Sequence, residues 1–156
     1  MLGRARFASI RRPCVPDVQT MVTIINARAA EGLILPRSQN YVYQNLRDFC
    51  VAEENGKLVG CGSLHVLWGD LGEIRGLATT EEAPVGLEGQ LVQALLAEGR
   101  RLGLPHVFAF MSRPQVLLEQ GFVLADRDSL PRIAWRECID CVKFPNCDEV
   151  PVWIDL

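Results

Sequence analysis

The chain has 156 residues, of which 49% are hydrophobic and 22% charged, and its formal net charge is −3. This length suits one globular domain whose core needs no disulfide or metal, and the dispersed basic residues argue against nucleic acid or an anionic membrane surface as a partner. No apolar run has the length of a signal peptide or a membrane span, so we expect a single cytoplasmic unit over residues 1–156.

The first elements in the chain are a strand and two helices. Residues 6–11 have strand character, although their alternation is imperfect. Pro16 and Asp17 suit the start of a helix that ends near residues 30–32. Its apolar residues share one face: Val18, Met21, Val22 and Ile25. Ser38 suits the cap of a second, shorter helix.

A hairpin is the clearest local signal in the sequence. Residues 49–54 and 57–68 are two apolar strands separated by Asn55-Gly56, a dipeptide that favours a two-residue turn with positive φ angles. Gly60 and Gly62 weaken the second of these strands, and they mark either a bulge or a close contact.

A third antiparallel strand follows the turn at Gly69-Asp70. Residues 73–79 alternate charged and apolar side chains, as a strand with two different faces does. Glu73 and Arg75 share one face, whereas Ile74 lies on the other.

A glycine-bearing loop and a long helix come next. From Leu87 the apolar residues recur at three- and four-residue spacing, and Gly103 suits the left-handed stop of the helix. The loop carries Gly86 and Gly89. A loop that leads into a helix presents unpaired amides and the positive end of the helix dipole, which suits a phosphate or pyrophosphate. The alternative is an ordinary crossover whose glycines only allow tight packing.

The remaining elements alternate between strand and helix. Residues 105–110 form a short buried strand, Arg113-Pro114 begins a short helix that ends at Gly121, and residues 122–125 begin another strand. The order of elements predicts an α/β fold with a mixed, mostly antiparallel sheet and helices on its faces.

The six cysteines are expected to be reduced. Cys14, Cys50 and Cys61 are predicted to be core residues, because disulfides are rare in the cytoplasm. Residues 130–156 form a tail predicted to pack on the domain. It holds the other three cysteines: Cys138, Cys141 and Cys147. A structural zinc site needs four ligands and no histidine lies nearby, so a packed tail without metal is favoured over a zinc site.

Four stretches carry a resemblance to a known family: GLILPRS, EIRGLAT, SRPQVLLEQGF and CIDCVKFPNCDE. Together with the order of elements, they resemble the GCN5-related N-acetyltransferases (GNAT) over nearly the whole chain, and within them the short bacterial N-acetylglutamate synthases that lack a kinase domain. The resemblance implies transfer of the acetyl group of acetyl-CoA to the α-amine of L-glutamate, the first step of arginine biosynthesis. It implies no metal and is compatible with a homodimer.

The resemblance also implies where acetyl-CoA binds. The thioester carbonyl and the pantetheine arm would meet the backbone amides of Leu77, Ala78 and Thr79, and the pyrophosphate would lie on the loop and helix start. That second group consists of Val85, Gly86, Leu87, Glu88 and Gly89. The family's loop usually has Arg or Gln, two residues, Gly, one residue, then Gly or Ala. Here the leading polar residue is absent, and Glu88 occupies the second small position, where its charge would repel a pyrophosphate.

For catalysis, the resemblance implies that Glu73 is the base, directly or through water, and the alternative is a purely structural salt bridge with an arginine. Ser112 stands where relatives often have a tyrosine that donates a proton to the leaving thiolate. The acceptor would be held by four residues: Leu35, Arg37, Arg75 and Arg113. A dicarboxylate needs at least two cationic partners, and the guanidinium fork suits a carboxylate best. Arg37 and Arg113 are favoured, because Arg75 has Glu73 as a partner on the same strand.

Two other functions compete with this hypothesis. One keeps the acetyl transfer but uses another small anionic amine or amino acid as acceptor. The other is a catalytically weak acetyltransferase fold that serves as a binding or regulatory partner, which the altered pyrophosphate loop suggests.

Overall fold

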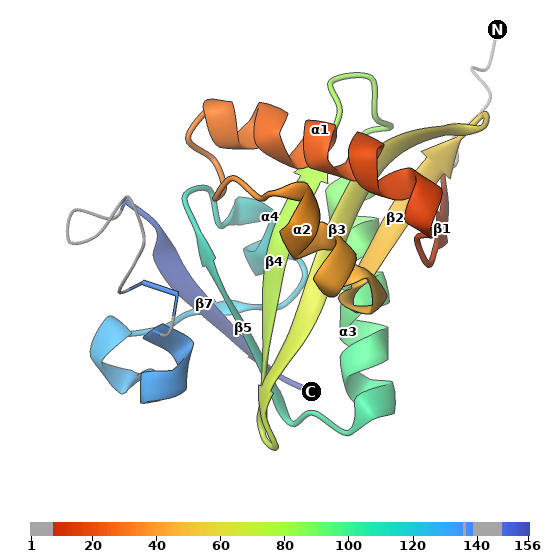
Figure 1. Cartoon of the computed structure of the whole chain (residues 1–156). Helices are drawn as coiled ribbons and strands as arrows, with labels where there is room; N and C mark the ends of the chain where they lie inside the picture. Colours follow the sequence, from red (N-terminus) through yellow and green to blue (C-terminus); the bar gives the residue numbers. More distant parts are fainter. Residues whose placement is uncertain (1–7, 136, 139–147) are drawn as a thin grey trace, which may run out of the picture.

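The computed structural model describes residues 8–135, 137–138 and 148–156, and within them the chain forms one seven-stranded sheet covered by helices (Figure 1). The strands are β1 (Ser9–Arg11), β2 (Phe49–Glu54), β3 (Lys57–Trp68), β4 (Leu71–Thr79), β5 (His106–Met111), β6 (Val123–Leu124) and β7 (Val150–Asp155). The α-helices are α1 (Val18–Ala30), α2 (Gln39–Gln44), α3 (Leu87–Leu102) and α4 (Gln115–Glu119). Short 3-10 turns are η1 (Val15–Asp17), η2 (Leu46–Asp48), η3 (Arg127–Ser129) and η4 (Arg132–Trp135).

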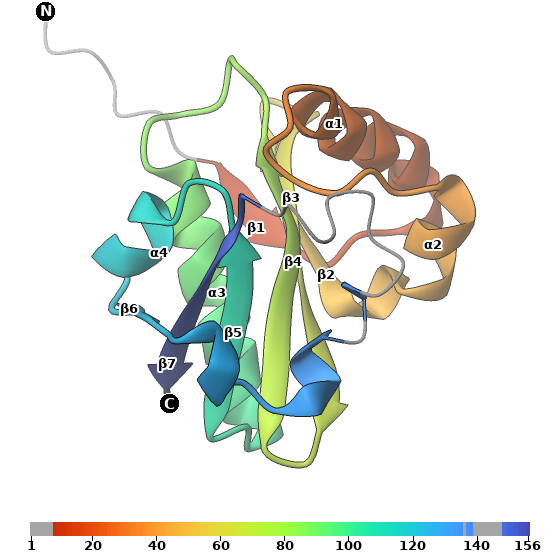
Figure 2. The same ribbon diagram turned by 90° about the vertical axis from the view of Figure 1, so that its left-hand side faces the viewer.

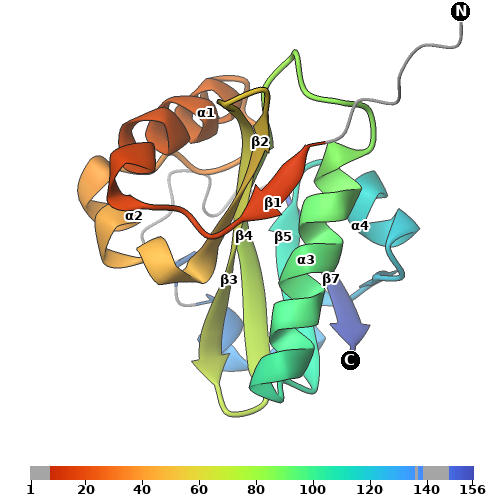
Figure 3. The same ribbon diagram turned by 90° about the vertical axis from the view of Figure 1, so that its right-hand side faces the viewer.

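The strand order is β1-β2-β3-β4-β5-β7-β6, and β4 with β5 is the parallel pair among otherwise antiparallel neighbours. Helices α1 and α2 cover one face of the sheet, while α3 and α4 cover the other (Figures 2 and 3). Each face therefore has its own apolar cluster, one centred on Met21 and Phe49 and the other on Leu91 and Leu95. The predicted fold class, a mixed sheet with helices on its faces, is confirmed.

Several local predictions are also confirmed. Asn55 and Gly56 have φ angles of 52° and 76° and join β2 to β3 as an antiparallel hairpin. The Ser38 hydroxyl accepts a hydrogen bond from the amide of Tyr41 at 3.1 Å and so caps α2. Gly103 ends α3 in the left-handed conformation, with a φ of 81°.

The two glycines of β3 mark a close contact with α3. A Cβ atom on Gly60 would lie 3.1 Å from Cδ1 of Leu91, and one on Gly62 would lie 3.2 Å from Cδ1 of Leu95. Because any larger side chain would push the helix outward, the glycines set the distance between α3 and the sheet.

The tail contains a strand that the sequence did not reveal. Val150–Asp155 forms β7, which pairs with β5 on one side and β6 on the other, so the end of the tail is a strand of the sheet. The proline at position 151 argues against a strand, because proline donates no ladder hydrogen bond. It is tolerated here, and its carbonyl accepts a hydrogen bond from the amide of Ala125.

Two smaller predictions need correction or fall outside the described residues. Cys50 and Cys61 are buried as predicted, but Cys14 is exposed in the loop before η1. The first strand is shorter than predicted, beginning at Ser9. Cys141 and Cys147 lie outside the described residues, as do residues 6 and 7 of the predicted strand, whereas Cys138 is half-buried.

Across the described chain, no helix is both long and apolar enough to cross a membrane.

Candidate active site

The central feature of the sheet is an opening between the parallel strands β4 and β5. In the described chain these strands are paired from Leu71 to Glu73, where Glu73 lies opposite Phe108. Strand β5 goes on to Met111 with β7 as its partner, and β4 goes on to Thr79 with β3 as its partner. Beyond Glu73 the two strands therefore diverge, as Figure 1 shows.

A bulge in β4 accounts for this divergence. Ser63 pairs with Arg75 and Cys61 pairs with Ala78, so that Gly76 and Leu77 together lie opposite the single residue Gly62. Gly76 has a φ of 60°, a backbone conformation that favours glycine. An extra residue bends the strand that carries it, which turns the end of β4 away from β5.

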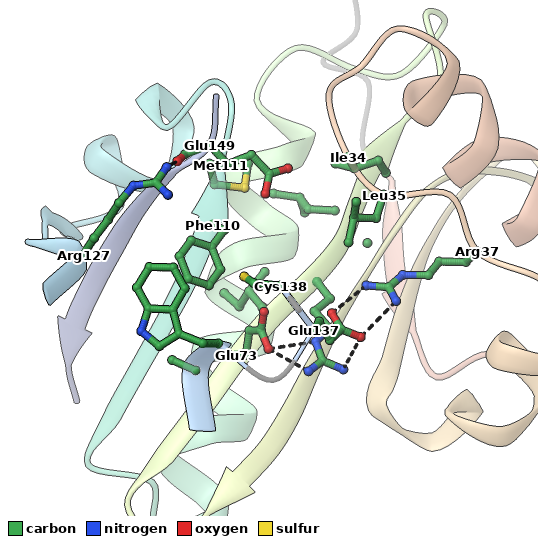
Figure 4. Close-up of a pocket in the computed structure, with 16 residues that line it drawn as sticks. Ile34, Leu35, Arg37, Glu73, Phe110, Met111, Arg127, Glu137, Cys138 and Glu149 are labelled. Carbon is green, nitrogen blue, oxygen red and sulfur yellow. Dashed lines mark hydrogen bonds and ion pairs between the residues drawn. The ribbon is translucent and has the colours of Figure 1, made fainter. Parts of the chain in front are cut away.

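The opening forms a pocket with an apolar side and a charged side (Figure 4). The apolar side is lined by Leu35 from the loop before α2, by Leu77 of β4, by Phe110 and Met111 of β5, and by Trp135 of η4. Two aromatic rings of this set, Phe110 and Trp135, lie with centroids 5.4 Å apart. A polar group that enters the pocket thus meets the charged residues described next beside an apolar wall.

The charged side next to β4 contains two carboxylates and two guanidinium groups, while Arg127 and Glu149 line another part of the pocket. Nη2 of Arg75 lies 2.7 Å from Oε2 of Glu73. Arg37 donates two hydrogen bonds of 3.1 Å to the two carboxylate oxygens of Glu137, and Nη1 of Arg75 lies 3.3 Å from Oε1 of Glu137. Figure 4 shows Glu73, Arg37 and Glu137 converging from β4, from the loop before α2 and from the segment after η4.

The position of Arg37 is fixed from several directions. Its backbone amide and carbonyl both hydrogen-bond to the Asn26 side chain on α1, each at 2.9 Å. Its guanidinium carbon lies 4.3 Å from the centroid of the Tyr41 ring, a cation–π contact. The Tyr41 hydroxyl in turn accepts a hydrogen bond from Arg75 at 3.3 Å. Both arginines are therefore held in place before any ligand arrives.

Glu73 combines burial with a charged neighbour. Its side chain is 8% exposed, and this burial raises its pKa to about 7, against the lowering effect of Arg75. The salt bridge with Arg75 that the sequence left as an alternative is present. A carboxylate whose pKa lies near neutrality is also suited to accept a proton at neutral pH.

This raised pKa predicts a pH-dependent stability. Between the ordinary pKa of 4.5 and about 7, the folded protein holds a proton on Glu73 that the unfolded chain has lost. The stability that this bound proton contributes to the folded protein is therefore complete below pH 4.5 and disappears as the pH rises through 7. We expect the free energy of unfolding of the wild type, relative to that of Glu73→Gln, to fall by roughly 3 kcal/mol from pH 4.5 to pH 8. Urea unfolding of both proteins across this range measures it, and a constant difference would contradict it.

A cluster of polar side chains on the neighbouring strand β3 lies beside the charged side, and the sequence predictions did not include it. His65 of β3 pairs across the sheet with Glu73, and Ser63 pairs with Arg75. The Ser63 hydroxyl donates to the Arg75 carbonyl at 2.9 Å and lies 2.7 Å from Nε2 of His65, whose Nδ1 lies 3.5 Å from Asp48. The alternation of β3 places Ser63 and His65 on one face, so this signal was available in the sequence.

The other predicted site residues divide into two groups. Leu35, Arg37 and Arg75 line the pocket together with Glu73. Ser112 and Arg113 follow β5, and in the part of the chain that the structure describes neither lines the pocket. The Ser112 hydroxyl lies 3.5 Å from the carbonyl oxygen of Gly32, and Arg113 is exposed. Glu137, which contacts both arginines, has no signal in the sequence around it.

The start of α3 lies at the wide end of the opening, beyond Thr79. Gly86 precedes the helix with a φ of 86°, and the amides of Glu88 and Gly89 fall in its first turn, where no preceding helical carbonyl is available. The Glu88 carboxylate accepts a hydrogen bond from the Thr79 hydroxyl at 3.2 Å. A Cβ atom on Gly89 would lie 2.7 Å from Nε2 of Gln120, so this glycine allows the residue after α4 to pack against α3.

Comparison with known proteins identifies the family. The model of the acetyltransferase (GNAT) family matches residues 24–116, more than half of the chain. The chain belongs to the acetyltransferase (GNAT) family. An uncharacterized N-acetyltransferase of Chlorobaculum tepidum is 30% identical over 142 residues, which cover 90% of this chain and 92% of that protein.

Two further relatives of this GNAT chain carry more specific names. The amino-acid acetyltransferase of Mycobacterium tuberculosis is 34% identical over 117 residues, which cover 72% of this chain and 67% of that protein. The N-acetylglutamate synthase of Neisseria gonorrhoeae, solved with coenzyme A and N-acetyl-glutamate, matches 96% of this chain with a TM-score of 0.85 and 25% identity. The present chain spans 35% of the length of that synthase.

The comparisons and the fold agree on the class of the enzyme. The GNAT chain is an N-acetyltransferase that uses acetyl-CoA, related to amino-acid acetyltransferases. Among the described residues, no group of three or more His, Cys, Asp and Glu side chains is arranged to hold a metal ion.

Proposed function

We propose that this GNAT enzyme transfers the acetyl group of acetyl-CoA to the α-amine of L-glutamate by direct attack in the pocket beside Glu73. One observation carries the proposal: a buried carboxylate base and two arginines lie together where β4 diverges from β5. The named relatives support it, since they include an amino-acid acetyltransferase and an N-acetylglutamate synthase.

In the proposed reaction, acetyl-CoA supplies the thioester. Glu73 accepts a proton from the ammonium group of the acceptor, directly or through one water. The amine nitrogen then forms a bond to the acetyl carbon and loses its second proton as the carbon–sulfur bond breaks. The sulfur leaves as a thiolate and takes up a proton, so that the reaction releases one proton overall, the one that Glu73 had accepted. A base with a pKa near 7 is half deprotonated at neutral pH, which suits this proton transfer.

The chain also offers donors for the charge that develops on the thioester oxygen. We place this oxygen at the amides of the β4 bulge, with Leu77, Ala78 and Thr79 along the pantetheine arm. Beyond Glu73 this edge of β4 has no strand partner among the described residues, so its amides are available. Preorganised backbone donors of this kind stabilise developing charge in a site that excludes water.

The pyrophosphate of CoA would lie at the first turn of α3, from Val85 to Gly89. The positive end of a 16-residue helix favours an anion there. Glu88 works against this, because its carboxylate lies in the same turn. Its hydrogen bond to Thr79 holds the carboxylate towards the end of β4.

Replacing Glu88 with glycine is expected to tighten CoA binding several-fold, because a like charge near the pyrophosphate is removed. Calorimetric titration of CoA measures the effect, with Glu88→Gln as the variant that removes the charge but keeps the size of the side chain. Equal or weaker binding in both variants would show that Glu88 serves the helix and Thr79 only.

The acceptor would lie on the arginine side of the pocket. Arg37 and Arg75 supply two guanidinium groups for carboxylates, and Leu35 contributes an apolar wall. The roles of Arg113 in acceptor binding and of Ser112 in catalysis remain predictions. In the described chain, neither residue lines the pocket.

The proposal is tested by thiol release from acetyl-CoA with and without L-glutamate. We expect CoA release that depends on glutamate and exceeds the background hydrolysis. A panel of amino acids and other small anionic amines, with radiolabelled acetyl-CoA, then compares acceptors, and preferred transfer to another one would reject glutamate. If a folded protein gives no heat with millimolar CoA, the alternative of a binding or regulatory module is supported instead.

A further inference from the structure

The two guanidinium groups of the pocket already hold a carboxylate that belongs to the chain itself. We call Arg37 and Arg75 the arginine clamp. Both oxygens of Glu137 accept hydrogen bonds from Arg37, in the paired geometry that a bound carboxylate would adopt, and one of them also lies 3.3 Å from Arg75. Glu137 thus occupies the position that the proposed function gives to the acceptor.

Glu137 is ionised in this position. Burial alone would raise its pKa, but the hydrogen bonds and the charge of Arg37 outweigh burial and hold the pKa below its usual range. When Glu73 is also ionised, as about half of it is at neutral pH, the two carboxylates in contact with the clamp balance its two guanidinium groups. If Glu137 stayed in place when an acceptor carboxylate entered, three carboxylates would lie next to only two guanidinium groups. Such an excess of like charge is unfavourable in a largely buried site.

The clamp and Glu137 differ in how firmly they are held. Arg37 is fixed by Asn26 and Tyr41, and the side chains of Arg37 and Arg75 are 12% and 13% exposed. Glu137 lies 100 positions along the chain from Arg37, after η4, and its side chain is 29% exposed. The arginines therefore form the fixed part of the contact, and Glu137 is the partner that a ligand can replace.

We propose that Glu137 determines acceptor specificity by occupying the arginine clamp until a carboxylate of the acceptor takes its place. This inference rests on the proposed function and specifies how its acceptor site selects. A ligand with a carboxylate restores the two ion pairs that are lost when Glu137 leaves, whereas a neutral ligand of the same shape does not. The pocket then discriminates through the unpaired charges that a neutral ligand would leave behind.

The test compares Glu137→Gln with Glu98→Gln. Glu98 is a matched control, because its carboxylate is also held by two arginines, Arg12 and Arg101, but on α3 outside the pocket. The probes are glutarate, a dicarboxylate, and glutaramide, its neutral diamide. Neither has an amine to acetylate, so calorimetry measures binding independently of turnover.

We expect Glu137→Gln to bind glutarate about tenfold more tightly than the wild type, the factor for a clamp that is open about a tenth of the time. Glutaramide should bind much more weakly than glutarate to both proteins, because it leaves the two guanidinium groups without a carboxylate. Glu98→Gln should behave as the wild type with both probes. Unchanged or weaker glutarate binding in Glu137→Gln, or no glutarate binding at all, would overturn the proposal and show that Glu137 only positions the arginines.

A replacement variant and a separate measurement of turnover cover the cases in which Glu137→Gln does not fold or the proposed function fails. If Glu137→Gln does not fold, Glu137→Asp keeps the charge but shortens the reach of the carboxylate, and glutarate should then bind more tightly by a smaller factor; no gain would overturn the proposal. The proposed function fails separately, if the wild type releases no CoA with glutamate. Tighter glutarate binding in Glu137→Gln would still support the exchange of carboxylates in that case.

Discussion

Replacing Glu73 with glutamine is expected to lower kcat/KM for acetyl transfer by about 10²–10⁴-fold, the usual contribution of a positioned general base. Glutamine keeps the size of the side chain and accepts hydrogen bonds from Arg75, but it cannot accept the proton of the acceptor ammonium. CoA binding should not change, because the proposed pyrophosphate site lies at the start of α3. Initial rates with varied acceptor, together with calorimetry of CoA, separate the two effects.

The pH profile distinguishes a base from a structural ion pair. The kcat/KM of the wild type should rise with pH and level off above about 7, because burial raises the pKa of Glu73 to about 7 and only its ionised form accepts a proton. Glu73→Gln should lack this step. A variant that loses activity but keeps the step would assign the base to another group and leave Glu73 as a partner of Arg75.

Local rules predict much of this fold. The Asn55-Gly56 turn fixes the hairpin because few dipeptides accept two consecutive positive φ angles. Simple alternation places Glu73 and Arg75 on one face of β4, and both line the pocket. These features depend on residues that are close in sequence, which is why one sequence is enough to find them.

The parts that were missed depend on contacts between distant residues. Glu137 contacts Arg37 across 100 positions, and no local pattern marks it as a pocket residue. Strand β7 contains a proline, and proline disfavours a strand between two others. The pairing with β5 and β6 nevertheless makes this segment a strand. Arg113 is exposed just before α4, so its role as a carboxylate ligand stays a prediction.

Arg37→Ala should raise the KM for L-glutamate by about 10- to 100-fold, the cost of losing hydrogen bonds between a guanidinium group and a carboxylate. CoA affinity should not change. Arg37→Lys should recover only part of the loss, because an ammonium group keeps the charge but not the paired hydrogen bonds. Arg113→Ala is the comparison, and an equal rise there would place Arg113 in the acceptor site.

The interpretation of Arg37→Ala depends on Glu137, which loses its paired partner in that variant. If the released Glu137 carboxylate alone caused the rise in KM, the rise would disappear when Arg37→Ala is combined with Glu137→Gln. If Arg37 binds the acceptor, a large rise should persist relative to Glu137→Gln alone. The double-mutant cycle therefore separates the two contacts of one guanidinium group, and an unchanged KM for Arg37→Ala in both backgrounds would remove Arg37 from the acceptor site.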